Sequence, residues 1–195
     1  YRAHLDLMIE MQKIGYVYGN EDLGVFGVHR HGPALAGRLQ NLFLWADCIA
    51  DFDPAFIRSG GGDPDDVFFR GLAYRMMWTL HWDVAGDVLS YRYGGPQGDD
   101  DRPAPWHLDL LRVYNRVQET MRERTILPGE AGVLYRSKGE RVLWAFEDLR
   151  LPLRGEESVL DVLSGETVSV RDELHAARHR VYLMIGEPVP GADGK

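Results

Sequence analysis

The chain has 195 residues, of which 45% are hydrophobic and 27% charged, and its formal net charge is -8. This length predicts one or two domains with a hydrophobic core, and the ordinary charged fraction argues against a wholly disordered chain. The acidic balance argues against duplex nucleic acid and against an anionic membrane surface as partners, because both attract clustered basic side chains.

Cysteine usage and hydropathy exclude further classes of protein. A single cysteine, Cys48, leaves no intrachain disulfide and excludes a cysteine-rich zinc site. No apolar run approaches the ~20 residues of a membrane span, and no signal peptide is visible, so we expect no membrane partner and favour a cytoplasmic location. The chain opens with Tyr1, which is consistent with a trimmed or processed chain or with a piece of a longer gene.

The first part of the chain is rich in amphipathic stretches at helical spacing. Pro33 and Pro64 each suit the first position of a helix, and Asp63 suits the cap before it. Asp53-Pro54 is expected to end or bend the earlier helix. In chain order the sequence predicts a helix over 2–14, a strand over 16–18, a helix over 33–53, a helix from 64 onward and a strand over 88–93.

In the rest of the chain the spacing of apolar residues changes from helical to alternating. Residues 94–105 contain Gly, Pro and an acidic triplet and predict a linker, and a last helix is predicted over 107–124. Beyond Pro128, apolar residues alternate in short segments between turns, which predicts an antiparallel β-sandwich. The expected strands are 132–135, 141–146, 149–153, 159–163, 167–170 and 180–185.

Two phrases in this second part carry a resemblance to a known group of enzymes. The hairpin reads Asp161-Val162-Leu163-Ser164-Gly165-Glu166, and the last strand contains Val181-Tyr182-Leu183. Together with the helix before them, these segments resemble the end of barrel-type glycoside hydrolases, the α-amylase-like and related families. In those enzymes a last barrel helix is followed by a small β-sandwich. The resemblance covers about the last third of the chain.

The resemblance implies an α/β plus all-β chain. Residues 1–127 would form a partial (β/α) barrel-type or helical part, residues 128–188 an antiparallel β-sandwich, and residues 189–195 a tail. A complete barrel takes ~250 residues, so the first part would need a missing N-terminal barrel portion or a second copy in a homo-oligomer. The isolated chain could then be inactive, although the full enzyme would hydrolyse glycosidic bonds.

Asn20-Glu21-Asp22 is the first candidate for chemistry. It follows a predicted strand, and barrel enzymes keep their reactive residues at the carboxyl ends of strands. Glycoside hydrolysis needs two carboxyl groups that face the scissile bond, and adjacent residues on a strand point to opposite faces. Glu21 or Asp22 would therefore pair with a carboxylate from another strand. The resemblance implies that Glu21 is the acid/base and that Asn20 holds a sugar hydroxyl, whereas the other interpretation is a polar turn.

The aromatic segment that contains His81, Trp82 and Asp83 is the second candidate. Asp83, or Asp87 behind it, would be the partner carboxylate. The expected substrate is a carbohydrate, and this interpretation requires no cofactor and no metal. Stacking on a sugar ring is expected from Trp78 and Trp82, and binding to its hydroxyls is expected from Asn20, His29, His31 and His81.

Two other functions remain open on the sequence. The chain could be a non-catalytic carbohydrate-binding or interaction module. It could also be an Fe(II)-dependent oxygenase, because His81-x-Asp83 supplies two ligands of a two-His-one-carboxylate site and His175 or His179 could supply the third. The repeat of the same spacing at His107-x-Asp109 shows how common the pattern is.

Overall fold

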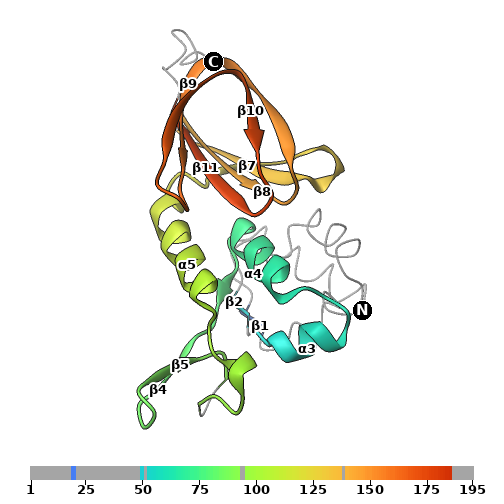
Figure 1. The fold of residues 1–195 in the computed structure, drawn as a ribbon, viewed down its shortest axis with the longest axis vertical. Coiled ribbons are helices and arrows are strands. Elements are labelled where there is room, and N and C mark those ends of the chain that lie inside the picture. The colour runs from blue at the N-terminus through green and yellow to red at the C-terminus, as the bar shows by residue number, and fades with distance from the viewer. Residues whose placement is uncertain (1–18, 21–48, 51, 93–94, 138, 186–195) are drawn as a thin grey trace. The chain divides into compact units, whose positions relative to one another are not determined.

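In a computed structural model of the chain, residues 19–20, 49–50, 52–92, 95–137 and 139–185 are described (Figure 1). The chain divides into two compact units, Tyr1–Leu111 and Arg112–Lys195. The described residues form mostly β-strands, with a few helices between them.

The first unit contains three short parallel strands. They are β1 (Gly19–Asn20), β2 (Ile49–Ala50) and β3 (Met77–Trp78), with β2 between the other two. Asn20 aligns with Ala50, and Ala50 aligns with Trp78. The carboxyl ends of the three strands therefore lie at one edge of this sheet.

Two helices connect β2 to β3. Helix α3 spans Pro54–Ser59, and α4 spans Pro64–Ala73. The cap that the sequence predicts is present, because the Asp63 carboxylate accepts a hydrogen bond of 3.0 Å from the backbone N–H of Asp65. At the other end Arg75 adopts a positive φ of 65°, and the N–H of Met76 donates to the carbonyl of Gly71, which is the Schellman ending of a helix.

After β3 the chain forms a hairpin and then a long helix. The hairpin pairs β4 (His81–Asp83) with β5 (Val88–Ser90), and the short helix η2 (Asp99–Asp101) follows. Helix α5 (Pro105–Val117) then runs across the division between the two units.

The second unit is one curled antiparallel sheet of six strands in the order β10-β9-β11-β8-β7-β6. The strands β7 and β8 carry runs of consecutive buried residues, and the 13-residue β9 is long enough to pair with two neighbours. Their bounds are β6 Glu123–Ile126, β7 Gly132–Ser137, β8 Glu140–Ala145, β9 Leu149–Asp161, β10 Thr167–Ala176 and β11 Arg180–Ile185, and the short helix η3 spans Pro128–Glu130.

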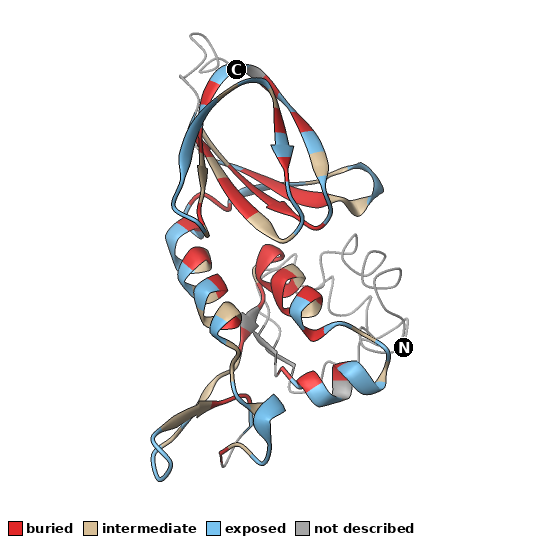
Figure 2. Cartoon of the chain, viewed as in Figure 1, coloured by how far each residue is buried: buried red, intermediate tan, exposed pale blue. Residues whose placement is uncertain are grey.

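Apolar side chains from five of these strands form the core of the second unit. In Figure 2 the buried residues gather on β7, β8 and β11, whereas much of β10 is exposed. This pattern follows from the sheet order, since β10 lies at an edge. The core consists of Leu134, Leu143, Ala145, Leu151, Leu153, Val159, Leu174, Ala176, Tyr182 and Met184.

The hairpin phrase that carries the resemblance is a tightly bonded turn. The Asp161 carboxylate accepts the backbone N–H groups of Leu163 and Ser164 at 3.0 and 3.2 Å. Gly165 has a φ of 77°, a conformation that L side chains rarely adopt. These residues therefore fix the β9–β10 turn.

The predicted fold is confirmed in its coarse form. The second part is antiparallel β-structure, and the strand predicted over 180–185 is β11. The hydrogen-bonded strands join in a single curled sheet, so the two layers of a sandwich are not confirmed. Three two-residue parallel strands are too few to confirm a partial barrel. The predicted division at residue 127 stays a prediction.

Two local predictions differ from the structure. The helix predicted over 107–124 spans Pro105–Val117, and Glu123–Ile126 forms β6 instead. Pairing of β6 with β7 in the sheet overrides the helical spacing of the segment before it. In addition, Ile49–Ala50 lies inside the helix predicted over 33–53 but forms strand β2, which pairs with β1 and β3, and Pro54 opens α3 instead of ending a helix. Residues 33–48 of that predicted helix lie outside the described residues.

Candidate functional site at the carboxyl ends of the parallel strands

Phe52 and Trp78 mark the carboxyl ends of β2 and β3 in the first unit. Phe52 comes two residues after β2, and its ring lies 5.1 Å from that of Trp78, which ends β3. Helix α4 starts after β2 and ends before β3, so it returns the chain to the amino ends of the strands. The edge near Phe52 and Trp78 is the edge at which open and closed α/β sheets bind their ligands.

An aromatic cluster around Phe52 packs beside the carboxyl ends of β2 and β3. Phe52 contacts Phe68, Trp78, Tyr91 and His107 at ring-centroid distances of 5.0, 5.1, 4.7 and 5.4 Å. The cluster holds together segments from β2, α4, β3, β5 and α5. It therefore fixes the positions of the polar groups that its members carry.

Trp78 belongs to this cluster. It is 7% exposed, and its indole N–H donates a hydrogen bond of 3.1 Å to the carbonyl of Phe68. A Cβ added at Gly71 would lie 2.1 Å from the Trp78 ring, so the glycine makes room for the indole. Trp78 is a core residue in this structure, and its predicted stacking on a sugar stays a prediction.

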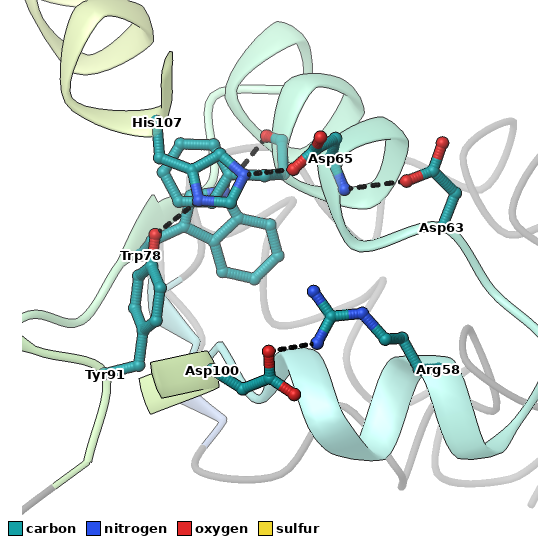
Figure 3. A network of polar contacts seen from close by, with 8 residues as sticks. Arg58, Asp63, Asp65, Trp78, Tyr91, Asp100 and His107 are labelled. Atoms are coloured by element: carbon teal, nitrogen blue, oxygen red, sulfur yellow. Dashed lines mark hydrogen bonds and ion pairs between the residues drawn. The ribbon is translucent and has the colours of Figure 1, made fainter. Parts of the chain in front are cut away.

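Tyr91, His107 and Asp65 form a polar chain from the core to the surface (Figure 3). The Tyr91 hydroxyl lies 2.6 Å from Nδ1 of His107, and Nε2 of His107 lies 2.9 Å from Oδ1 of Asp65. The His107 side chain is 4% exposed, whereas that of Asp65 is 57% exposed. The ring of Phe68 stacks on the imidazole at 4.1 Å. We call these three residues the His107 junction.

The pKa shifts of His107 and Tyr91 and the acceptor character of Asp65 together indicate which ring nitrogen of His107 carries its proton. Burial lowers the pKa of His107 below its usual 6.5, and the charge of Arg58 lowers it further, while Asp65 and Asp63 act in the opposite direction. Burial and the Asp65 charge raise the pKa of Tyr91 above its usual 10.0. Because a carboxylate only accepts, the imidazole N–H belongs on Nε2, and the neutral Tyr91 hydroxyl donates to Nδ1.

Ion pairs lie beside the junction. Arg58 of α3 binds the Asp100 carboxylate at 2.6 Å, and Arg92 approaches Asp101 at 3.9 Å. In Figure 3, Arg58 points into the space between Asp100 and the start of α4. Exposed carboxylates and a guanidinium group are suited to binding polar groups such as hydroxyls.

The β4–β5 hairpin carries three of the predicted site residues. Trp82 is 56% exposed, and its neighbour Val84 is 82% exposed. His81 and Asp83 lie on the opposite face of β4 from Trp82, because successive strand residues alternate. The indole of Trp82 is therefore open to solvent, and its predicted stacking on a sugar stays a prediction.

The Asp83 carboxylate is engaged within the hairpin. Its Oδ1 accepts the N–H of Ala85 and its Oδ2 accepts the N–H of Gly86, both at 3.2 Å. A Cβ at Gly95 would lie 2.8 Å from Oδ2, so this oxygen also faces backbone. In this structure Asp83 orders the turn, and its predicted catalytic role stays a prediction.

The side chains of the remaining predicted site residues are not described in the structure. Glu21, Asp22, His29 and His31 lie outside the described residues, and of Asn20 only the backbone is described, at the end of β1. The parallel register nevertheless aligns Asn20 with Trp78 two strands away.

Sequence reasoning missed the His107 junction. In the sequence, His107 is singled out only as part of a common His-x-Asp spacing. A contact between α4, the residue after β5 and α5 leaves no spacing signal in the sequence. One signal in the sequence could have indicated the junction. His107 falls on the apolar face of the predicted helix, and a buried histidine needs polar partners.

No group of three His, Cys, Asp or Glu side chains in the described parts of the chain is arranged to hold a metal ion. His81 and Asp83 belong to the first unit, whereas His175 and His179 belong to the second. Among the described helices, none is long and apolar enough to cross a membrane.

Comparisons with known proteins give little to set beside this geometry. No protein-family model matches the sequence, and no curated protein matches it. One solved structure, a Bacillus halodurans C-125 protein provisionally described as an alpha-N-acetylgalactosaminidase, is similar over 64% of this chain with a TM-score of 0.35 and 11% identity. The match covers 32% of that protein, so this chain spans less than a third of its length.

Proposed function

We propose that this chain is a glycoside hydrolase, or part of a longer one, with its site at the carboxyl edge of β1, β2 and β3. The observation that carries the proposal is the parallel register of the three strands, in which Asn20 and Trp78 end β1 and β3 at the same edge. The sequence continues from these ends with Glu21-Asp22 and with His81-Trp82-Asp83.

In this proposal two carboxylates flank the glycosidic bond. Glu21, or Asp22 beside it, protonates the leaving oxygen, and Asp83 acts as nucleophile or as the base that activates water. Two strand spacings of about 4.8 Å separate the ends of β1 and β3. Asp83 follows the end of β3 by five residues and lies in β4. The engagement of Asp83 in its turn requires the hairpin to adjust when substrate binds.

Binding of the sugar is proposed to use aromatic and polar side chains from the same segments. The exposed indole of Trp82 stacks on the apolar face of a sugar ring, and Asn20, His29, His31 and His81 contact hydroxyls. Trp78 supports this site from the core. The rest of a barrel would come from a further part of the protein or from a second copy of the chain.

The test uses the product of the complete reading frame and a panel of chromogenic glycosides. We expect hydrolysis of at least one glycoside, and a loss of about 100-fold or more in kcat for Glu21→Gln and Asp83→Asn. Asp99→Asn, an exposed acid in η2, is the matched control and retains activity. Far-ultraviolet circular dichroism excludes misfolding of each variant. No hydrolysis of any glycoside, or full activity of both carboxylate variants, would contradict the proposal.

A non-catalytic carbohydrate-binding module is the second candidate. The observations that favour it are the exposed Trp82 beside an Asp83 carboxylate whose two oxygens are already bonded. Saccharide binding that depends on Trp82, without hydrolysis by the complete protein, would support this candidate over the first.

A further inference from the structure

Three segments of the first unit meet at the imidazole of His107. They are the start of α4 with Asp65, the residue after β5 with Tyr91, and the start of α5 with His107 itself. Each ring nitrogen lies within 2.9 Å of a polar atom from another segment. The ring is also packed between Phe68, stacked at 4.1 Å, and Phe52, edge-on at 5.4 Å.

We propose that the His107 junction is a pH-sensitive contact that fastens Tyr91 and the start of α5 to α4 while the imidazole is neutral and loosens when the imidazole takes up a proton. This role is separate from the proposed glycoside chemistry and does not depend on it.

In the neutral junction each ring nitrogen of His107 faces an oxygen from another segment. Nδ1 accepts from the Tyr91 hydroxyl, and the Nε2–H faces the Asp65 carboxylate. The backbone reinforces the position of Tyr91, since its N–H donates a bond of 2.7 Å to the carbonyl of Asp101. Tyr91 is 5% exposed, so water does not readily replace these bonds.

A proton on Nδ1 removes this arrangement. The protonated nitrogen no longer accepts, so the Tyr91 hydroxyl has to turn and accept from it instead. The hydroxyl proton then needs a new acceptor, and within the described residues the hydroxyl has no second partner. A buried donor without an acceptor destabilises the contact, which favours opening of the segment around Tyr91.

The charged groups around the ring act in both directions. Asp65 and Asp63, at the start of α4, stabilise the imidazolium, whereas Arg58 of α3 opposes it. Arg58 is itself paired with Asp100 of η2. On α5, Asp109 is exposed two residues beyond His107. Burial is the largest single influence and lowers the pKa of His107, so protonation requires mildly acidic solution.

The test is amide hydrogen exchange of the complete protein at pH 7.5 and pH 5.0, with rates corrected for the intrinsic effect of pH. We expect corrected exchange around Tyr91 and the first turn of α5 to be about tenfold faster at pH 5.0, as for loss of one buried hydrogen bond. His107→Phe keeps a ring against Phe68 and is expected to abolish the acceleration. His175→Phe, on exposed β10, is the matched control and retains it.

A second measurement keeps the proposal falsifiable if His107→Phe does not fold. Nitrogen-15 spectra of the wild-type imidazole are expected to show the proton on Nε2 at pH 7.5 and a His107 titration below pH 6.5, with altered Tyr91 resonances over the same range. Equal corrected exchange rates at the two pH values, an unchanged acceleration in His107→Phe, or a proton on Nδ1 at pH 7.5 would each overturn the proposal.

Discussion

The hydroxyl of Tyr91 lies 2.6 Å from Nδ1 of His107, although 16 positions separate the two residues in the chain. The contact fastens the segment after β5 to the start of α5, and His107 continues it to Asp65 at the start of α4. Tyr91 and His107 both contact the ring of Phe52, two residues after β2, so the junction packs beside the carboxyl end of that strand.

Removal of the Tyr91 hydroxyl is expected to destabilise the protein. Tyr91→Phe keeps the ring against Phe52 but leaves the buried Nδ1 of His107 without its donor. A loss of about 1–3 kcal/mol in the free energy of unfolding is expected, measured by urea denaturation at pH 7.5. In a double-mutant cycle with His107→Phe, the two losses are expected to be strongly non-additive. Simple additivity would show that the hydroxyl acts elsewhere.

The pKa of His107 also predicts how stability depends on pH. The folded-state value lies below the usual 6.5, so the unfolded chain binds the proton more readily. The contribution of a neutral His107 is fully present above pH 6.5 and is lost as pH falls from 6.5 toward the folded-state pKa. Urea denaturation at several pH values between 7.5 and 5.0 measures this loss. His107→Phe should show a smaller decrease than wild type over that interval, and an equal decrease would contradict the assignment.

The indole of Trp78 packs so closely against Gly71 that a side chain at this position would clash with it. A Cβ at Gly71 would lie 2.1 Å from Cζ2 of the indole, so Gly71→Ala is expected to cost about 1–3 kcal/mol of unfolding free energy despite the better helix propensity of Ala. Gly98→Ala has no atom within 4 Å of the new Cβ and is the control, expected within about 0.5 kcal/mol of wild type. Thermal denaturation measures both, and equal effects would show that the indole moves aside.

The second unit contains a buried ion pair and an exposed one, which we expect to contribute differently to stability. Arg141 of β8 binds Glu157 of β9, and the Glu157 side chain is 6% exposed. Arg141→Met leaves that carboxylate without this partner and is expected to cost about 3 kcal/mol. The matched change Arg150→Met breaks an exposed pair with Glu173, at 3.5 Å, and is expected to cost less than about 1 kcal/mol. Similar losses in urea denaturation would contradict the difference in burial.

Trp82 separates ligand binding from folding. The side chain is 56% exposed, so Trp82→Ala is expected to leave the unfolding free energy almost unchanged. Loss of a stacked sugar ring is expected to weaken saccharide binding about fivefold to tenfold in calorimetric titration. Val84→Ala, on the same hairpin and more exposed, controls for removal of an apolar side chain. Equal effects of the two variants on binding would contradict a stacking role.

Local signals predicted the elements that local interactions decide. Asp63 and Pro64 mark the start of α4 because capping and the proline φ act within a few residues. A short run of apolar residues marks β11, and the turn residues Asp161 and Gly165 mark the hairpin before it.

Contacts between distant segments were not accessible from the sequence. The spacing before β6 is helical, yet pairing with β7 makes Glu123–Ile126 a strand. The indole of Trp78 is aromatic and near polar residues, which suggests a ligand, but Phe52 and Gly71 from other segments enclose it. Tyr91 and His107 meet only because β5 and α5 fold against α4.

The central claim is that acidic residues that follow β1 and β3 in the chain act on one sugar. An experimental structure of the complete protein with a bound saccharide tests it most directly. We predict a sugar ring on Trp82 and carboxyl groups of Glu21 and Asp83 within about 10 Å of each other. Carboxyl groups more than about 15 Å apart, or a saccharide bound elsewhere, would contradict the claim.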